Sequence, residues 1–170
     1  MDQAWATDIT YIPLQKGFLY LVAIMDLHSR HVLSWKLSNS LDTELYLEAL
    51  EMALSSGRRP QIFHSDKGCQ FSSTDFVARL QTEEIKISLS GRKRCYDNIL
   101  VERLWRTLKY EEVYLRAYSD GWEAEICLAR FLWKYCRVRP HSALGGRTPH
   151  AAYTETETFS ARPELTIFGA

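Results

Sequence analysis

The sequence predicts an α/β fold in which helices cover both faces of a mixed five-stranded sheet. Three strand-like segments follow one another within the first 37 residues, and short strands alternate with helices after them. Strands joined by short turns pair antiparallel, whereas strands separated by a helix are added in parallel. The expected order of elements is therefore β-β-β-α-β-α-β-α-α. At 170 residues the chain has the length of one ordinary domain.

The first three strands are indicated by alternating or continuous apolar residues. Residues 5–12 carry β-branched and aromatic side chains on alternate positions, and residues 13–17 supply a turn that contains Pro13 and Gly17. Residues 18–26 are apolar at nearly every position, which is typical of a central strand covered on both faces. Residues 30–37 follow a short polar link. Together these segments predict an antiparallel meander.

Helices and short strands alternate over the rest of the chain. A helix is predicted from about residue 42 to residues 55–57, then a strand over 61–64, a helix over 74–81 and a strand over 85–89. Residues 90–96 are polar and basic and predict a loop. Asp97 is the candidate N-cap of a helix to about residue 114, and a last helix covers about residues 119–135. Three tryptophans in these last helices are expected in the core: Trp105, Trp122 and Trp133.

The composition is that of a soluble globular protein, with 46% hydrophobic and 25% charged residues. The longest apolar run, residues 18–25, is too short to span a bilayer, and the first residues lack a secretory signal pattern. A cytoplasmic location is therefore expected. The four cysteines are widely spaced and fit no zinc motif, so they are expected to be reduced thiols: Cys69, Cys95, Cys127 and Cys136.

The formal net charge is zero, yet the charges are distributed unevenly. Residues 91–109 hold six Lys or Arg against two acids, and residues 134–147 hold four with no acid. Phosphate binding rests on Lys and Arg side chains that release counterions from the nucleic acid. A net charge of zero therefore conceals an uneven charge distribution, and the two basic segments suit a nucleic-acid partner.

Three acids stand where carboxylates can converge on divalent metal ions. Asp8 lies within an apolar strand, Asp66 at the carboxyl end of a short strand, and Glu102 in the first turns of a helix. A carboxylate inside a strand is costly unless it is paired, hydrogen-bonded or bound to metal. The carboxyl ends of strands are also where ligands of α/β sheets tend to bind. A hard cation such as Mg²⁺ needs a few oxygen ligands and room for substrate phosphate.

Each acid taken singly also has a structural explanation. Asp8 is also explained as an aspartate at a strand end, where its side chain contacts water or an arginine. Asp66 fits a turn cap ahead of Gly68. Glu102 fits a solvated ion pair with Arg106, four residues further along the same helix. These alternatives stay open as long as each segment is considered alone.

Four sequence motifs follow one another along the chain. They are Trp5-Ala-Thr-Asp8-Ile-Thr-Tyr-Ile, then His64-Ser65-Asp66-Lys-Gly68-Cys-Gln70-Phe71, then Gly91-Arg92 followed by Asp97-Asn98-Ile-Leu-Val-Glu102-Arg-Leu-Trp-Arg-Thr-Leu-Lys109, and last Arg139-Pro-His-Ser-Ala-Leu-Gly-Gly-Arg-Thr-Pro149. Together they resemble the catalytic core of bacterial insertion-sequence transposases, in the retroviral-integrase-like group with an Asp, Asp, Glu triad. The gap of 35 residues between Asp66 and Glu102 is typical of that group. The resemblance covers residues 5 to about 153.

The resemblance implies a ribonuclease-H-like fold, with a core domain over residues 1–153 and a tail over residues 154–170. It implies that Asp8, Asp66 and Glu102 are catalytic and bind two Mg²⁺ or Mn²⁺ ions, which assist in-line displacement at phosphorus during DNA cleavage and strand transfer. Basic and polar side chains around these acids are expected to contact DNA: Arg92, Lys93, Arg94, Asn98, Arg106, Lys109, Arg139 and His141.

The resemblance also implies partners. A homo-oligomer that acts on element ends and target DNA is expected, associated with the nucleoid when active. Relatives carry a helical DNA-recognition region before the first strand, whereas Met1 stands four residues ahead of Trp5. A separate helix-turn-helix protein from an upstream reading frame is therefore an expected partner.

Two other functions remain alternatives at this point. One is a nuclease of the ribonuclease H type, with the same metal ligands and an RNA–DNA hybrid as substrate. The other is a truncated, catalytically inactive remnant that binds DNA or a partner protein.

Overall fold

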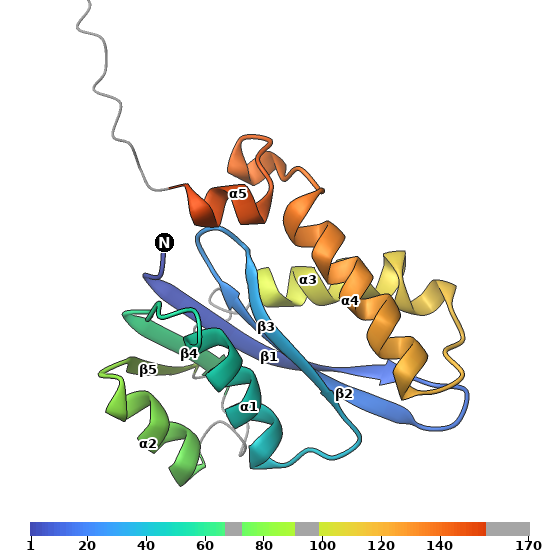
Figure 1. Ribbon diagram of the computed structural model, residues 1–170, viewed down its shortest axis with the longest axis horizontal. Helices are drawn as coiled ribbons and strands as arrows, with labels where there is room; N and C mark the ends of the chain where they lie inside the picture. Colours follow the sequence, from blue (N-terminus) through green and yellow to red (C-terminus); the bar gives the residue numbers. More distant parts are fainter. Residues whose placement is uncertain (67–72, 91–98, 156–170) are drawn as a thin grey trace, which may run out of the picture.

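The structure, a computed structural model, describes residues 1–66, 73–90 and 99–155. Five strands form one mixed sheet in the order β3-β2-β1-β4-β5 (Figure 1). Pairing is antiparallel between β1, β2 and β3 and parallel between β1, β4 and β5, so the predicted mixed sheet is confirmed. The strands are β1 (Ala4–Pro13), β2 (Phe18–Asp26), β3 (Val32–Ser38), β4 (Ile62–Asp66) and β5 (Lys86–Ser90).

Helices pack against both faces of this sheet and create two separate cores. One core joins the sheet to α1 and α2, and the other joins it to α3 and α4. The helical elements are α1 (Thr43–Leu54), α2 (Thr74–Thr82), α3 (Ile99–Glu111), η1 (Val113–Leu115), α4 (Gly121–Arg137), η2 (Ser142–Leu144) and α5 (Pro149–Thr154). The predicted fold class is thereby confirmed.

Strand β2 explains why a central strand is apolar at nearly every position. Its side chains alternate between the two faces. Leu21, Ala23 and Met25 belong to the core under α3 and α4, whereas Val22 and Ile24 belong to the core under α1 and α2. Because both faces are covered, neither set can be polar without leaving a buried polar group.

Helix α3 ends earlier than the sequence predicts. Its buried stripe is spaced as residues 101, 104, 105 and 108, and residue 113 falls outside that stripe in a continued α-helix. The backbone leaves the helix at Glu112, and the 3₁₀ turn η1 that follows places Val113 in the core. The next helix, α4, begins at Gly121, where Asp120 accepts a hydrogen bond from the Glu123 backbone N–H as its N-cap.

The expectation that all three helical tryptophans are core residues is wrong for two of them. Trp105 is buried, but Trp122 and Trp133 are 73% and 56% exposed. The buried stripe of α4 contains Ala124, Leu128, Leu132 and Tyr135, and the two indoles lie on the opposite side of the helix. Helical spacing places them on one side but does not reveal which side of α4 faces the sheet.

Several predictions fall outside the described residues. They concern Cys69, Cys95, the N-cap Asp97, residues 91–96 of the predicted loop and residues 156–170 of the tail. Cys127 and Cys136 are free thiols. No helix in the described part of the chain is long and apolar enough to cross a membrane.

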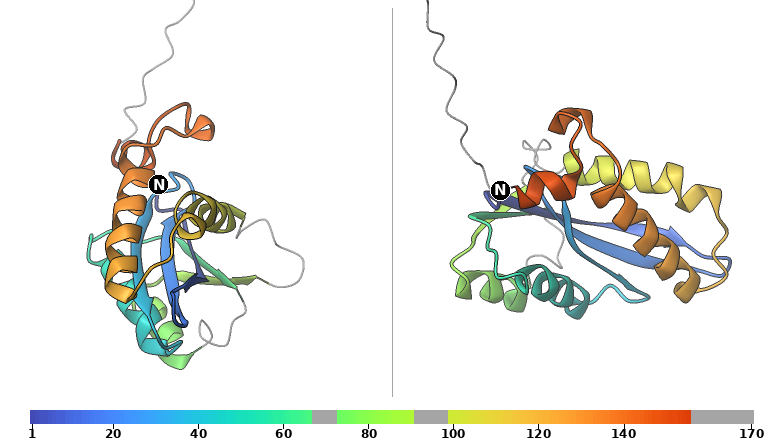
Figure 2. Two further views of the ribbon diagram at one scale, coloured as in Figure 1. Left: turned by 90° about the vertical axis from the view of Figure 1, so that its right-hand side faces the viewer. Right: turned by 45° about the horizontal axis from the view of Figure 1, so that its top comes forward.

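The short helix α5 docks against the N-terminus, as both views in Figure 2 show. The Tyr153 hydroxyl donates to Asp2 Oδ1 at 2.9 Å, and the Arg58 guanidinium lies 4.4 Å from the centroid of the Tyr153 ring. The His31 ring stacks on Tyr153 with 5.1 Å between centroids. These contacts connect both ends of the described chain to the link before the edge strand β3 and to the segment after α1.

His31 is the titratable group most affected by this packing. Burial is the main cause that lowers its pKa to about 4, and the nearby His150, Arg137 and Arg58 lower it further. Asp26 acts in the opposite direction. His31 is therefore neutral in the folded protein at neutral pH.

The depressed pKa of His31 predicts a loss of stability in acid. Between the ordinary value of 6.5 and about 4, the unfolded chain binds a proton that the folded chain does not. The free energy of unfolding should therefore fall as the pH is lowered through that window, by about 1 to 3 kcal/mol after allowance for solvent screening. Urea unfolding at a series of pH values measures this. His31→Gln should flatten the slope, whereas the exposed control His28→Gln should keep it, and equal slopes in all three proteins would contradict this account.

Candidate active site

Asp8 lies in the middle of the sheet with a side chain that meets a helix. It occupies β1, opposite Ala23 of β2, and it is half-buried. Its Oδ2 accepts a hydrogen bond of 3.0 Å from the Trp105 indole N–H of α3. A buried carboxylate with a hydrogen-bond donor is held in one orientation and is less costly than an unpaired one. This contact ties α3 to the central strand.

Glu102 lies on the same helix, one turn before Trp105. Its side chain is exposed, although the neighbouring Val101 and Leu104 are fully buried. Residues three apart share a side of a helix, and a helical side chain leans over the turn on its N-terminal side. The Trp105 indole therefore reaches Asp8 from beneath the turn that carries Glu102. The contact of Trp105 with Asp8 thus connects the helix that carries Glu102 to the strand that carries Asp8.

Asp66 is the last residue of β4, and the structure describes it through its backbone only. It pairs with Ser90 of β5. The parallel register of β1 and β4 matches Ala6 with His64, and the pairing ends there. Asp8 and Asp66 each lie two residues beyond that matched pair. The two aspartates therefore occupy corresponding positions on neighbouring strands, just past the last hydrogen-bonded pair.

The described geometry connects Asp8 with the neighbouring strand of Asp66 and with the helix of Glu102, and the meeting of the three side chains stays a prediction. Among the side chains that the structure describes, a set without Asp66, no three His, Cys, Asp or Glu residues form a group able to hold a metal ion. Glu102 has no ion pair with any described residue. The alternative structural role of Glu102, an ion pair with Arg106, is therefore absent among the described residues.

A basic cleft of about 700 Å³ borders the outer side of α3. It lies between that helix and the chain that follows α4. One acid, Glu111, stands among its cationic and polar side chains. The lining consists of Arg30, Arg103, Arg106, Thr107, Tyr110, Glu111, Tyr135, Arg139, Pro140, His141 and Ser142. We call this surface the basic cleft.

The basic cleft brings together three of the predicted DNA contacts, Arg106, Arg139 and His141. Lys109 lies in α3 but does not line the cleft. Four further predicted contacts lie outside the described residues: Arg92, Lys93, Arg94 and Asn98. The cleft also contains Arg30, Arg103 and Tyr110, which sequence reasoning did not single out.

The helical spacing of residues 103, 106, 107 and 110 was an available signal for one side of this cleft. These positions follow the i, i+3, i+4, i+7 pattern along α3. No comparable pattern marks Arg30. It adopts a left-handed backbone conformation, with φ of 61°, in the link between β2 and β3.

The glycine-rich segment after α4 forms a folded turn that holds Arg139 and His141 at the cleft. The His141 backbone N–H donates to the Arg147 carbonyl, and the Gly146 N–H donates to the His141 carbonyl, both at 3.0 Å. Gly145 and Gly146 have φ of 65° and 80°, which a residue with a Cβ adopts only with strain. Arg139 makes a two-pronged ion pair with Glu111 of α3, at 2.5 and 2.8 Å.

His141 is placed as a neutral imidazole beside cations. Burial is the main cause that lowers its pKa, and Arg30 and Arg139 lower it further, whereas a hydrogen bond from the ring to the Tyr135 backbone carbonyl raises it. Its ring meets Tyr135 edge to face, with 4.8 Å between centroids. Its Nε2 is buried and has no hydrogen-bond partner among the described residues. In the neutral ring this nitrogen is a hydrogen-bond acceptor, which a donor group of a ligand in the cleft would satisfy.

Comparisons with known proteins identify the family of the chain. Models described as "Integrase core domain" match residues 1–95 and residues 83–149. Transposase InsF for insertion sequence IS3A of Escherichia coli is 36% identical over 151 residues, which are 87% of this chain and 52% of the relative. A 31 kDa protein of insertion element IS600 from Shigella sonnei is 35% identical over 157 residues, 91% of this chain and 57% of the relative. The chain thus spans about half the length of these curated relatives.

Retroviral integrases are among the solved structures with the same fold. The HTLV-2 integrase catalytic core domain in complex with magnesium has a TM-score of 0.71 at 21% identity, and covers 88% of this chain and 94% of that one. The simian T-cell lymphotropic virus intasome has a TM-score of 0.77 at 20% identity, and covers 99% of this chain and 60% of that one. At these identities the likeness shows the fold. Because one family model covers more than half of its residues and transposases match most of its length, the chain belongs to the integrase core domain family.

Proposed function

We propose that this chain is the catalytic core of a DNA transposase, which cleaves DNA strands and joins them to a target with the help of divalent metal ions. The observation that carries the proposal is the hydrogen bond from Trp105 to Asp8. It fixes the start of α3, with Glu102, over the strand that carries Asp8, and the basic cleft lies on the outer side of the same helix. Glu102 and the cations of the cleft therefore stand on one helix, with Arg106 one turn after Glu102 on the same side.

The donor set suits a hard divalent cation. Asp8, Asp66 and Glu102 supply only carboxylate oxygens, the ligands that Mg²⁺ and Mn²⁺ prefer. Asp8 Oδ2 meets a neutral indole donor, and Glu102 faces solvent. When bound, a pair of such ions would activate a water or 3′-hydroxyl and stabilise charge at the phosphorus. The ion number and the choice of Mg²⁺ or Mn²⁺ belong to the proposal.

The chain's own contribution is to orient the carboxylates and the DNA. The Trp105 indole N–H holds Oδ2 of the Asp8 carboxylate, and the buried stripe of α3 anchors the helix that carries Glu102. Arg103, Arg106 and Arg139 would hold phosphates of the DNA backbone along the cleft, and His141 Nε2 would donate to a phosphate oxygen once a nearby phosphate favours the protonated ring. No covalent enzyme intermediate is required, so no nucleophilic side chain is assigned.

The relatives support this proposal. InsF is named as a transposase, and the HTLV-2 integrase core was determined in complex with magnesium. The proposal also includes a separate helix-turn-helix protein that selects the DNA ends.

Loss of either described acid should abolish metal-dependent cleavage. Asp8→Asn and Glu102→Gln should each reduce cleavage of element-end DNA in Mn²⁺ by more than about 100-fold, beyond the loss typical of outer-shell changes at metal sites. The carboxylate charge is lost while the shape is kept, so the thermal midpoint should stay near that of the unmodified chain without metal.

The exposed Glu125→Gln on α4 is the matched control, and it should cleave like the unmodified chain. Calorimetric titration with Mn²⁺ gives a second readout, because binding should weaken in both variants even if the isolated chain turns over slowly. Equal metal binding and equal cleavage in all four proteins would remove these acids from the mechanism. Preference for an RNA–DNA hybrid over duplex DNA would instead favour a nuclease of the ribonuclease H type.

Cations of the basic cleft should contribute to DNA affinity without regard to sequence. Arg103→Gln and Arg106→Gln should each weaken binding and reduce the slope of log K against log salt by about 0.9, the amount for one lost phosphate contact. Fluorescence anisotropy over a range of salt concentrations measures both. Lys86→Gln, an exposed cation on β5, should leave the slope unchanged. If all three variants keep the original slope, the DNA follows another path.

We also propose that the chain self-associates through the outer side of α4. Trp122, Ile126 and Trp133 are exposed there, and Trp133 lines a cleft of about 330 Å³ together with Met52 of α1 and residues of the edge strand β3. Exposed apolar patches of this kind mark protein interfaces. The HTLV-2 integrase core, which shares the fold, is described in a dimeric form.

A charge at the centre of this patch should prevent self-association. Trp133→Glu should lower the molar mass measured by light scattering from that of an oligomer to that of the monomer, because an unpaired carboxylate is costly to bury. Tyr114→Glu changes an equally exposed aromatic residue outside the patch and should leave the mass unchanged. An oligomer that survives Trp133→Glu would place the interface elsewhere.

A further inference from the structure

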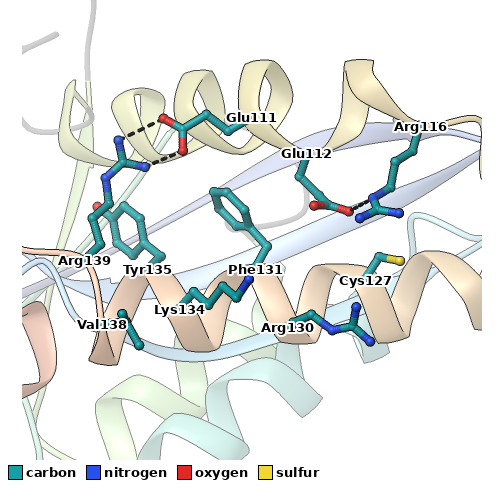
Figure 3. A pocket seen from close by; sticks show the side chains of 10 residues that line it. All are labelled: Glu111, Glu112, Arg116, Cys127, Arg130, Phe131, Lys134, Tyr135, Val138 and Arg139. Atoms are coloured by element: carbon teal, nitrogen blue, oxygen red, sulfur yellow. Dashed lines mark hydrogen bonds and ion pairs between the residues drawn. The ribbon is translucent and has the colours of Figure 1, made fainter.

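A second cleft lies next to the basic cleft, between the end of α3 with η1 and the helix α4. Its volume is about 380 Å³. Figure 3 shows the Phe131 ring rising from α4 toward α3, with Tyr135 beside it on the same side of the helix. The two rings are stacked, with centroids 6.4 Å apart and an angle of 26° between their planes. An aromatic surface therefore forms part of the lining.

The charges around this cleft leave two cations available. Glu111 and Glu112 are each engaged in an ion pair, with Arg139 and Arg116 respectively (Figure 3). Arg130 and Lys134 also line the cleft, one helical turn apart on α4. Neither has an ion pair within the described ranges of the chain. The cleft thus combines aromatic rings with unneutralised positive charge.

The two clefts adjoin each other. Glu111, Tyr135 and Arg139 line both of them. A DNA backbone that follows the basic cleft would reach the second cleft at the Arg139 ion pair. A polymer with an anionic backbone and planar aromatic groups matches both surfaces at once.

We propose that this second cleft binds an unpaired nucleotide of the DNA substrate, with the base against Phe131 and the phosphate at Arg130 and Lys134. This inference rests on the proposed function, since it extends the DNA path from the basic cleft. In a duplex, neighbouring bases cover the faces of each base, so only an unstacked base offers a face to an aromatic side chain. Stacking of this kind tolerates any base, and the cations supply affinity for the strand. The volume also lies within the range of small-ligand pockets, about 300 to 1,000 Å³.

Fluorescence anisotropy with two labelled DNAs, in the absence of divalent metal, tests this inference. One is a blunt duplex, and the other is the same duplex with a single-stranded thymidine overhang. The unmodified chain should bind the overhang DNA at least about fivefold more tightly, as expected for one stacked base. Phe131→Leu should remove most of that advantage while affinity for the blunt duplex stays within about twofold, because the change keeps apolar volume but removes the ring face.

Arg130→Gln combined with Lys134→Gln provides an independent variant on exposed positions, and it should also reduce the overhang advantage. Tyr11→Leu and Lys86→Gln are matched controls outside both clefts, and both should keep it. Thermal melting identifies any variant that fails to fold.

The outcomes separate this inference from the proposed function. Tight binding of the blunt duplex without an overhang advantage would overturn the inference and leave the transposase proposal in place, and the cleft would then suit an acidic protein segment instead. An advantage that persists in both the Phe131 and the double variant would also overturn the inference. A chain that binds neither DNA would overturn both proposals.

Discussion

The hydrogen bond between the Trp105 indole and the Asp8 carboxylate is the constraint on which the proposed site depends. A helix of 13 residues is marginal in water, so α3 owes its place to its buried stripe. Val101, Leu104 and Leu108 are fully buried, and each contributes about 1.5 to 3 kcal/mol. A buried indole N–H also requires an acceptor. The acceptor on the central strand is Asp8, so the packing that stabilises α3 also determines where Glu102 stands.

Helix α3 connects the proposed catalytic site to the proposed DNA path because its two sides make different contacts. The inner side packs against the sheet, while the outer side lines the basic cleft with Arg103 and Arg106. The ion pair between Glu111 and Arg139 joins its last turn to the glycine-rich turn after α4. An exposed ion pair contributes little to stability. Its effect here is to hold the turn after α4 next to the end of α3. It stands where the two clefts meet.

Much of the fold is encoded in local patterns, and the order of elements along the chain and the mixed pairing of the strands followed from them. Alternation in β1 and continuous apolarity in β2 indicated their pairing and burial, and the helix–strand alternation indicated the parallel strands. The site was less accessible to the sequence. The exposure of Trp133 depends on which side of α4 meets the sheet, and the place of Arg30 depends on a turn conformation brought near α3 by tertiary packing. No periodic pattern in the sequence indicates the exposure of Trp133 or the position of Arg30.

The most direct test of the central claim, that Asp8, Asp66 and Glu102 converge on metal, is a crystal structure of the chain soaked with Mn²⁺ and measured at the manganese absorption edge. The account predicts two anomalous peaks about 3.5 to 4 Å apart, bounded by the ends of β1 and β4 and the start of α3, with all three carboxylates as ligands. Manganese bound only at other side chains, with any of these three carboxylates directed elsewhere, would contradict it.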